Sequence, residues 1–327
     1  NDISINPKEI DETIMGCVLP AGLGQAPARQ AAMGAGIPSE SGATTINKMC
    51  GSGMKSIMFG HDSIKAQQNN IVVAGGLENM TNAPYILSKA RKGFRMGHAD
   101  VKDHMFLDGL EDAYEEGKLM GSFAEDTAEH YQFTREQQDN FAITSLERAK
   151  KANEDGTFDS EIVPIKVLNR KNEIIINKDE QPFKSDITKI STLKPAFRKN
   201  GTVTAANSSS ISDGASSVIL MLESEAQKRG IKPLARIIDH STNSKEPKWF
   251  TTAPIGAIEK VLEKSGWKKT DVDLFEVNEA FAVVPMAVMK DIGISNEILN
   301  IYGGACALGH PVGASGTRIV TTLINAL

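Results

Sequence analysis

Asn47-Lys48-Met49-Cys50-Gly51-Ser52-Gly53 is the stretch that decides the fold, because it places a thiol where a strand gives way to a helix. The preceding residues, Ala43-Thr44-Thr45-Ile46, have strong strand-forming character. After the stretch, apolar residues recur with roughly helical spacing at Met54, Ile57, Met58 and Ile64. The pattern predicts a strand, a tight turn and a helix, with Cys50 at the start of that helix.

A cysteine at a helix start is a candidate nucleophile. Unpaired backbone N–H groups and the helix dipole stabilise a thiolate, so we expect the Cys50 thiol to ionise more readily than a free cysteine. Gly51 and Gly53 lack side chains and would let a bulky substrate approach the sulfur. The alternative is a structural role in the core, since free cysteine is among the most buried residue types.

Composition narrows the class of protein. The 327 residues suffice for two domains, or for one large core with an insertion. With 40% hydrophobic and 24% charged residues, the composition is that of a globular protein. The net charge of −5, from 36 basic and 41 acidic residues, argues against a nucleic-acid partner. No apolar run approaches the length of a membrane span, so we predict no membrane partner.

Cysteine and histidine usage indicates a reducing compartment and no metal. Cys17, Cys50 and Cys306 are too few and too scattered for a disulfide framework. Cys17 and Cys306 are expected to serve packing. The six histidines include no pair at i, i+4, and no Cys-x-x-Cys is present, so we predict no metal site.

The N-terminal part predicts a βαβ unit. Residues 13–19 form a short apolar run, and a small-residue helix follows, with Pro27 in its first turn and Gly34 and Gly36 near its end. After the helix that follows Cys50, residues 71–76 form a continuous apolar run typical of a strand covered on both faces. Strand, helix and strand in succession indicate a parallel or mixed sheet in an α/β fold.

Residues 81–202 have a different texture and are predicted to be an insertion that folds over the sheet. Charged and polar residues dominate, and strand signals are limited to residues 162–165 and 174–176. One amphipathic helix is predicted over 134–152, with a capping box formed by Thr134 and Gln137. Such an insertion carries ligand contacts or forms an oligomer contact.

The sheet texture returns after residue 200. Residues 201–210 are small and leave backbone N–H groups accessible, which suits a phosphate or amide-bearing ligand, or an ordinary tight turn. A strand is predicted over 217–221, then a short helix capped by Ser224 and closed by Gly230, and a new domain near Leu234.

The C-terminal part repeats the layout seen around Cys50, in which a strand leads directly into polar residues. A helix is predicted over 255–264, ended by Gly266, and a strand over 274–277 that runs into Asn278. The run 298–301 then leads into a glycine-rich loop, and a helix opens near Thr317. Two halves of similar organisation indicate an internally duplicated fold.

Cys50 and His310 form the candidate catalytic pair. His310 lies between Gly309 and Pro311, in a glycine-lined turn before a helix, where it is better placed than an ordinary core or surface histidine to meet a nucleophile. An imidazole within reach would take the thiol proton and leave a thiolate able to attack a carbonyl. The amide of Asn278 could hold a water or an oxyanion. Glu279 would orient the site or cap the next helix.

Four segments resemble the signature blocks of the thiolase family, in the family's order. They are Asn47-Lys48-Met49-Cys50-Gly51-Ser52-Gly53, Ala74-Gly75-Gly76-Leu77-Glu78-Asn79-Met80, Asn278-Glu279-Ala280-Phe281-Ala282 and Gly309-His310-Pro311-Val312-Gly313-Ala314-Ser315-Gly316. The resemblance covers essentially the whole chain and is strongest to the acetoacetyl-CoA branch. It implies a duplicated βαβαβαββ fold in α/β/α/β/α layers with an inserted loop domain. The implied regions are 1–80 plus 203–232 (N-terminal half), 81–202 (loop domain that binds CoA and forms oligomer contacts) and 233–327 (C-terminal half).

The resemblance also implies roles. Cys50 would carry the acetyl group, His310 would activate it and help to bind the thioester oxygen, and Asn278 would hold a water in an oxyanion hole. Ala280 and Phe281 would line the acyl pocket. The implied contacts to CoA or its surroundings are Leu110, Met120, Ala205, Ser209, Phe250 and Lys184.

The implied reaction joins two acetyl-CoA molecules into acetoacetyl-CoA and CoA, and the reverse, as in fatty-acid and ketone-body metabolism. CoA is then substrate and product, and no separate cofactor is expected. Open alternatives are a 3-ketoacyl-CoA thiolase of fatty-acid degradation and a CoA-binding relative without condensation activity. A homodimer or homotetramer is expected, in the cytoplasm, in mitochondria or in peroxisomes.

Three departures from the family pattern accompany the resemblance. The C-terminal Cys-x-Gly-x-Gly block that carries the family's second active-site cysteine is not in the sequence, nor are the family's opening strand and helix, so we expect a longer natural chain. Cys306 lies only four residues before His310 and is not expected to replace that cysteine. Leu119 and Phe183 stand where the acetoacetyl branch often has histidine and arginine.

Overall fold

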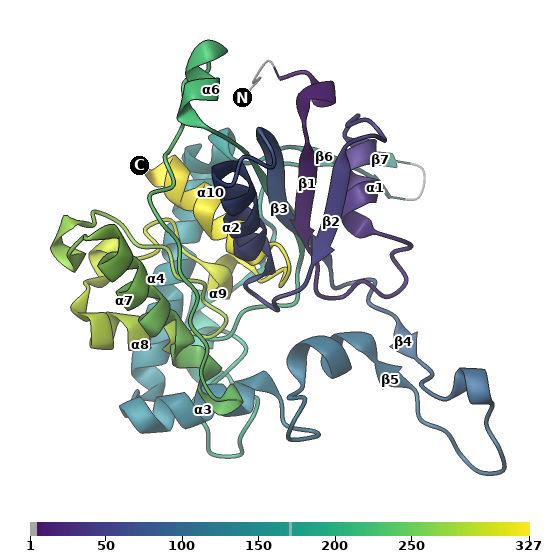
Figure 1. The fold of residues 1–327 in the computed structure, drawn as a ribbon. Helices are drawn as coiled ribbons and strands as arrows, with labels where there is room; N and C mark the ends of the chain where they lie inside the picture. The colour runs from purple at the N-terminus through teal and green to yellow at the C-terminus, as the bar shows by residue number, and fades with distance from the viewer. Residues whose placement is uncertain (1–4, 170–171) are drawn as a thin grey trace.

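The computed structural model describes residues 5–169 and 172–327, in which strands and helices follow one another along the chain (Figure 1). The strands are β1 (Glu12–Gly16), β2 (Gly42–Ile46), β3 (Ile71–Asn79), β4 (Tyr85–Ile86), β5 (Lys102–Asp103), β6 (Ile165–Asn169), β7 (Asn172–Ile176) and β8 (Asp213–Met221). The helices are α1 (Pro27–Gly34), α2 (Ser52–Lys65), α3 (Met120–Tyr131), α4 (Arg135–Glu154), α5 (Gln181–Lys184), α6 (Glu223–Lys228), α7 (Ala253–Ser265), α8 (Val283–Val288), α9 (Ala305–Leu308) and α10 (Ser315–Ala326).

A four-stranded mixed sheet organises the N-terminal part, with the order β2-β1-β3-β8. Strand β1 pairs in parallel with both β2 and β3, and β8 runs antiparallel to β3. The register places Gly16 beside both Ile46 and Gly76. The C-terminal ends of the three parallel strands therefore lie together, and the segment that carries Cys50 starts from this edge. The predicted mixed sheet is confirmed.

Helices cover both faces of this sheet. On one face, Ile14 and Val72 pack against Ile64 of α2. On the other face, Ile71 packs against Ala32 of α1. Alternate residues of a strand point to opposite faces, so β3 is buried on both sides, which explains its unbroken apolar run. Helix α10 lies beside α2 on the first face (Figure 1).

Local signals predicted several helices well. The capping box at the start of α4 is present: the Thr134 hydroxyl accepts a hydrogen bond from the Gln137 amide at 3.2 Å, and the Gln137 side chain accepts one from Thr134 N at 2.9 Å. Helix α7 ends at Gly266 in the left-handed region, with φ +72°. The predicted cap at Ser224 is wrong, because α6 begins at Glu223 and Leu222 occupies the cap position.

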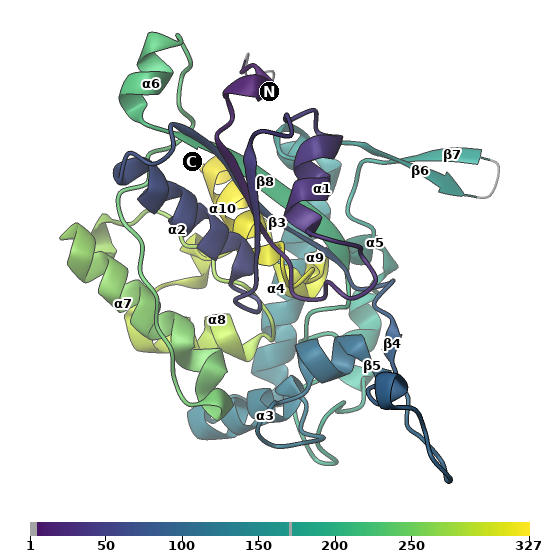
Figure 2. The same ribbon diagram turned by 45° about the vertical axis from the view of Figure 1, so that its right-hand side comes forward.

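The sequence predicted that the insertion folds over the sheet. The structure shows a different packing for its helices. Helices α3 and α4 pack instead against α8, α9 and the turn Pro247–Thr252 of the C-terminal part. The reason is a shared apolar core. Ala124 of α3 and Phe141 of α4 lie in it together with the buried apolar side chains of α8. Two hairpins, β4–β5 and β6–β7, project from the molecule (Figure 2). The division at residues 81–202 stays a prediction.

The strand predicted over 274–277 is reduced to one isolated bridge between Phe275 and Leu299. The reason is Asn300, which has a left-handed backbone with φ +47° and so turns the chain away. Its side chain replaces the next step of the ladder: Nδ2 donates to Val277 O at 2.8 Å, and Oδ1 accepts from Val277 N at 2.8 Å. The segment before Asn278 is thus held by side-chain hydrogen bonds.

Every helix in the described part of the chain is too short or too polar to cross a membrane.

Candidate active site

Cys50 lies in a tight turn between β2 and α2, one residue before the helix cap Gly51. Met49 has a left-handed backbone, with φ +48°. The Ser52 hydroxyl holds the turn, because it accepts a hydrogen bond from Lys48 N at 2.8 Å and donates one to Met49 O at 2.6 Å. The Asn47 side chain accepts a hydrogen bond from Met49 N at 2.9 Å. These bonds fix the backbone from which the thiol projects.

Glycines bring this turn against the loop that carries His310. A Cβ on Gly53 would lie 2.8 Å from Thr317 N and 3.0 Å from Gly313 O. A Cβ on Gly316 would lie 2.4 Å from Met54 N. The start of α2 and the His310 loop therefore meet backbone to backbone. The prediction that Gly53 admits a bulky substrate is wrong, since the protein itself fills that space.

Glu78, at the end of β3, ties the His310 loop to the residues that follow β1. Its buried carboxylate accepts hydrogen bonds from Val18 N at 2.9 Å, Leu19 N at 3.0 Å and Gly313 N at 2.8 Å. Val18, Leu19 and Val312 form one apolar cluster, and Cys50 packs against it. Glu78 thus anchors the His310 loop, and Cys50 shares a small apolar core with that loop.

His310 is buried and its ring is fixed by Ser315. Nδ1 lies 2.6 Å from the Ser315 hydroxyl oxygen, and that hydroxyl donates to Pro311 O at 3.0 Å. Because the hydroxyl hydrogen points to Pro311, the oxygen accepts from Nδ1–H, which leaves Nε2 as the acceptor nitrogen of the ring, with the Asn278 amide nitrogen as a hydrogen-bond donor 3.3 Å away. Burial, and then the positive charge of Arg318, lower the pKa of His310 to about 4. The imidazole is neutral at neutral pH and can accept a proton.

The Cys50 thiol is also neutral in the free protein. Desolvation raises its pKa to about 11, against the lowering effect of its own backbone hydrogen bond, and the carboxylate of Glu78 adds to the rise. The expectation that the helix start makes this thiol ionise readily is therefore wrong, because burial outweighs the dipole. A thiolate at Cys50 requires a proton acceptor, and Nε2 of His310 is suited to that role.

Asn278 lies against the imidazole. Its amide nitrogen is 3.3 Å from Nε2 and 3.5 Å from Nδ1 of His310. Its amide oxygen is buried without a hydrogen-bond partner among the described residues. An unpartnered buried acceptor beside a catalytic candidate is a place where a water or a substrate group would be held.

Glu279 is a structural anchor and does not touch the imidazole in the contacts described. It is fully buried, and its carboxylate accepts hydrogen bonds from Ser145 Oγ at 2.7 Å, Asn300 Nδ2 at 2.9 Å and Cys306 N at 3.0 Å. It therefore caps α9 and not the next helix, α8, which the sequence had suggested as one of two roles. The Cys306 sulfur packs against the large apolar core near Glu279 O.

The predicted acyl and CoA contacts are only partly brought together. Met120, Phe250, Ala280 and Phe281 belong to, or pack against, one apolar core. Ser209 joins this group, since its backbone N donates to Ala280 O at 3.1 Å and its hydroxyl donates to the same oxygen at 3.0 Å.

The other three predicted contacts lie outside this group. Leu110 ends a π-helical turn, Phe106–Leu110, and is partly buried. Ala205 is exposed in the loop before β8. Lys184 is exposed at the end of α5 and pairs with Glu180 at 3.6 Å. Their assignment to CoA stays a prediction.

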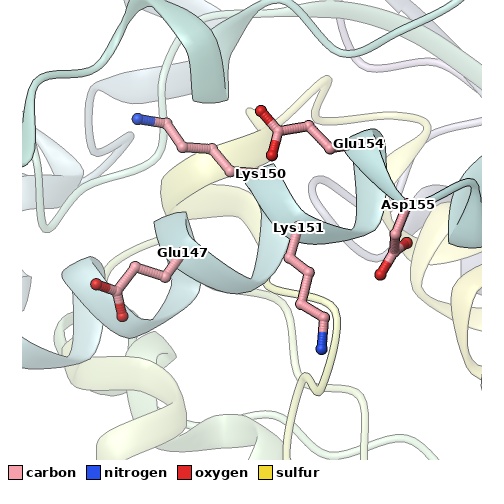
Figure 3. A pocket seen from close by; sticks show the side chains of 5 residues that line it. All are labelled: Glu147, Lys150, Lys151, Glu154 and Asp155. Carbon is pink, nitrogen blue, oxygen red and sulfur yellow. The ribbon is translucent and has the colours of Figure 1, made fainter.

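Two surface hollows lie elsewhere. One, of about 380 Å³, is lined only by charged side chains of α4 and the residue after it (Figure 3). Figure 3 shows that these side chains splay outward from the helix and do not converge. A second hollow, of about 430 Å³, is lined by His130, Tyr131, Lys245, Glu246, Trp249 and Thr252. Neither is lined by Cys50, His310 or Asn278.

Sequence reasoning missed two site residues, Ser315 and Glu78. Both stand within the glycine-rich blocks that were singled out. Ser315 is five residues after His310, and a hydroxyl on the first turn of the following helix could have been recognised as a partner for the imidazole. The contacts of Glu78 have no local signal, because they join residues 60 and 235 positions apart.

Comparison with known proteins places these blocks in one family. A family model described as "Thiolase, N-terminal domain" matches residues 1–224, and one described as "Thiolase, C-terminal domain" matches residues 231–327. A Staphylococcus aureus (strain COL) protein named probable acetyl-CoA acyltransferase is 46% identical, covering 100% of this chain and 83% of the relative. A Dictyostelium discoideum protein named probable acetyl-CoA acetyltransferase is 50% identical, covering 99% of this chain and 78% of the relative.

Solved structures agree with this placement. The Acat5 thiolase from Ascaris suum in complex with coenzyme A has a TM-score of 0.94 at 40% identity, covering 99% of this chain and 83% of that chain. The acetyl-CoA acetyltransferase of Bacillus anthracis has a TM-score of 0.95 at 41% identity, covering 99% and 82%. The layered α/β fold class predicted from the sequence is confirmed by these structures.

Proposed function

The chain belongs to the thiolase family, and from this membership we infer that it is an acetyl-CoA C-acetyltransferase, which interconverts two acetyl-CoA molecules with acetoacetyl-CoA and CoA. The relatives named above carry this activity or the related acyltransferase activity in their names. One observation supports the chemistry most directly. The turn of Cys50 packs against the loop of His310, whose Nε2 is the acceptor nitrogen of a neutral, buried imidazole.

The first half-reaction transfers an acetyl group to Cys50. Nε2 of His310 takes the thiol proton, and the thiolate attacks the thioester carbon of acetyl-CoA. The bond from that carbon to the CoA sulfur then breaks, and the CoA thiolate takes the proton from His310. The products are acetyl-Cys50 and free CoA. The neutral state of His310 supports this role, because a protonated imidazole could not accept the proton.

The second half-reaction makes the carbon–carbon bond. The second acetyl-CoA loses an α-proton to a base, and its α-carbon attacks the acetyl carbon on Cys50. The bond from the acetyl carbon to sulfur breaks, acetoacetyl-CoA leaves, and the Cys50 thiolate takes up the proton that the base removed. We assign to Asn278 the task of holding a water at the thioester oxygen, where negative charge develops. Its unpartnered buried oxygen beside His310 supports this assignment.

The acyl pocket is assigned to Ala280 and Phe281, with Met120 and Phe250 beside it. Phe281 stacks edge-to-face on Phe197, and Phe250 on Phe123, with ring centroids 6.0 and 6.3 Å apart. Aromatic rings that are already packed together leave little room for a long acyl chain, which supports an acetyl or acetoacetyl substrate. CoA itself is assigned to Leu110, Ala205, Ser209 and Lys184.

Acyl-chain length separates this function from that of a 3-ketoacyl-CoA thiolase. We expect faster thiolysis of acetoacetyl-CoA than of a medium-chain 3-ketoacyl-CoA. A higher kcat/KM for the medium-chain substrate would favour the second activity, which the name of the Staphylococcus aureus relative also accommodates.

The acetyl intermediate gives the sharpest test. Intact-protein mass spectrometry after incubation with acetyl-CoA should show one added acetyl group on the wild type and none on Cys50→Ser. Cys17→Ser is a matched control, because Cys17 is buried and bonded to Glu78. A wild type that gains no acetyl group would favour a CoA-binding relative without transfer activity.

We also propose a homodimer or homotetramer in the cytoplasm. The exposed β6–β7 hairpin carries apolar side chains, with Ile165 60% and Ile175 57% exposed, and such a surface is typical of a protein contact. The three cysteines described are free thiols, as a reducing compartment requires. Light scattering during size-exclusion chromatography tests the oligomer, with Ile165→Lys as the variant expected to weaken it. Fluorescence microscopy of the tagged protein tests the compartment.

A further inference from the structure

Two histidines and an aspartate meet on the side of the molecule away from the Cys50 turn. His61 and Asp62 lie in the C-terminal part of α2, and His240 lies in the extended segment that follows α6. The Asp62 Oδ1 atom is 3.2 Å from His61 Nδ1 and 2.8 Å from His240 Nε2. One ligand atom from each of the three residues lies within 4.8 Å of the other two. Sequence spacing gave no signal, because His240 is 178 positions from Asp62.

Two of the three distances between ligand atoms are close to those of a tetrahedral metal site. Zinc binds imidazole nitrogen and carboxylate oxygen at about 2.0–2.1 Å, which places neighbouring ligand atoms about 3.3 Å apart. The two distances from Asp62 Oδ1 lie within about half an ångström of that value. The His61 and His240 rings stand at 90° with centroids 5.2 Å apart, so their nitrogens approach the carboxylate from different directions.

The backbone around these ligands is fixed. A Cβ on Gly60 would lie 2.8 Å from Leu220 Cδ1, so this part of α2 is held tightly against the sheet. Behind His240, the Asp239 carboxylate accepts a hydrogen bond from His240 N at 2.7 Å, and Lys264 Nζ donates to His240 O at 2.7 Å. Such outer contacts orient ligands in metal sites.

The local charge favours a cation. The C-terminal end of α2 carries the negative end of the helix dipole. Of the nearby positive charges, Lys264 forms an ion pair with Asp239, while Lys65 lies in the last turn of α2, three residues after Asp62. The His61 and His240 side chains are 20% and 22% exposed, so a solvent ion can reach them.

We propose that His61, Asp62 and His240 bind one divalent transition-metal ion, of which Zn²⁺ is the best match, with the fourth position left for water. Two histidines and one carboxylate are a donor set that zinc accepts. This proposal departs from the sequence prediction of no metal and does not rest on the proposed transferase function. The ion would join α2, which follows the nucleophile, to the segment matched by the C-terminal family model.

Metal titration tests the site directly. The chain is stripped with a chelator and carries Cys50→Ser, which removes a competing thiol. Zn²⁺ is then titrated in competition with a chromogenic chelator at pH 7.5. We expect one equivalent to bind, and His61→Ala and His240→Ala each to weaken binding at least tenfold. His98→Ala is the matched control, because His98 is exposed on a distant loop, and it should bind as the parent does.

Cobalt(II) gives a second readout. A tetrahedral site with nitrogen and oxygen ligands gives visible absorption that should be present in the parent and lost in the His240→Ala variant. Thermal unfolding without metal checks that each variant folds, and His240→Gln, which can still donate a hydrogen bond to Asp62, replaces any alanine variant that does not. No bound equivalent in the parent, or binding as tight as the parent's in either histidine variant, would overturn the proposal.

Discussion

His310 Nδ1 lies 2.6 Å from the Ser315 hydroxyl oxygen, and this contact decides which imidazole nitrogen can act as a base. Since the Ser315 hydroxyl hydrogen is bonded to Pro311 O, Nδ1 carries the imidazole proton and Nε2 is the acceptor. The position of a hydroxyl on the first turn of α10 thus fixes the chemistry of a side chain five residues earlier.

Ser315→Ala should slow the acetyl transfer without unfolding the protein. Without the hydroxyl, the imidazole can rotate or adopt the other tautomer, so we expect kcat to fall about tenfold to a hundredfold while KM changes little. Single-turnover acetylation of Cys50 measures the step directly. Ser39→Ala is the control, because its exposed hydroxyl bonds only Glu40 in the described contacts. An unchanged acetylation rate in Ser315→Ala would contradict the role of this contact.

Cys50 should react slowly with alkylating reagents at neutral pH. Its pKa of about 11 means that the thiolate fraction rises by about tenfold per pH unit from pH 7 to pH 10. The rate of iodoacetamide labelling, followed by peptide mass spectrometry, should rise with the same slope. A plateau near pH 8.5, the value of an ordinary thiol, would show that the helix start overcomes burial after all.

His310 should make the protein less stable in acid. Its pKa is about 4 when folded and about 6.5 when unfolded, so the unfolded chain binds a proton first as the pH falls. This contribution is absent above pH 7 and costs about 2 kcal/mol at pH 5. His310→Asn should therefore lose about 2 kcal/mol less unfolding free energy than the wild type between pH 7.5 and 5, measured by urea denaturation. Parallel curves for the two proteins would contradict the shift.

The sequence predicted those features that depend on neighbouring residues. The apolar run of β3, the capping box at Thr134 and the terminating Gly266 each act within a few positions, and each is found in the structure. Cys50 and His310 could be selected because glycines and turns surround them in the sequence, and Asn278 because a predicted strand runs directly into it.

Features set by distant contacts could not be predicted. The strand over 274–277 fails because the Asn300 side chain occupies the positions of a neighbouring backbone. The ionisation of Cys50 was misjudged because helix position can be read locally, whereas burial depends on chain segments far away. The same limit hid the packing of α3 against α8 and of α4 against α9.

Gly53→Ala should impair both stability and transfer. The added methyl group would approach Thr317 N to 2.8 Å, and a backbone atom cannot move aside as a flexible side chain does. We expect a loss of about 1–3 kcal/mol in unfolding free energy and a lower acetylation rate, because α2 and the His310 loop are pushed apart. Gly34→Ala is the matched control, since a Cβ there meets nothing within 4 Å and a helical alanine is favoured. Equal unfolding free energies for Gly53→Ala and Gly34→Ala would show that the methyl group at position 53 is accommodated without loss of stability.

Glu78→Gln tests whether one carboxylate holds the floor of the site together. Its two oxygens accept hydrogen bonds from three backbone N–H groups, of Val18, Leu19 and Gly313, and an amide can offer only one oxygen to them. The amide NH₂ would then face at least one of these donors in a buried position, so we expect a loss of about 2–3 kcal/mol in urea denaturation. Because Gly313 belongs to the His310 loop, acetylation of Cys50 should slow as well. Glu12→Gln is the control, since Glu12 accepts from the side chains of Thr44 and Asn69 near the sheet edge and an amide oxygen can keep one of these bonds. Wild-type stability and acetylation in Glu78→Gln would mean that the apolar cluster around Val312 positions the loop without the carboxylate.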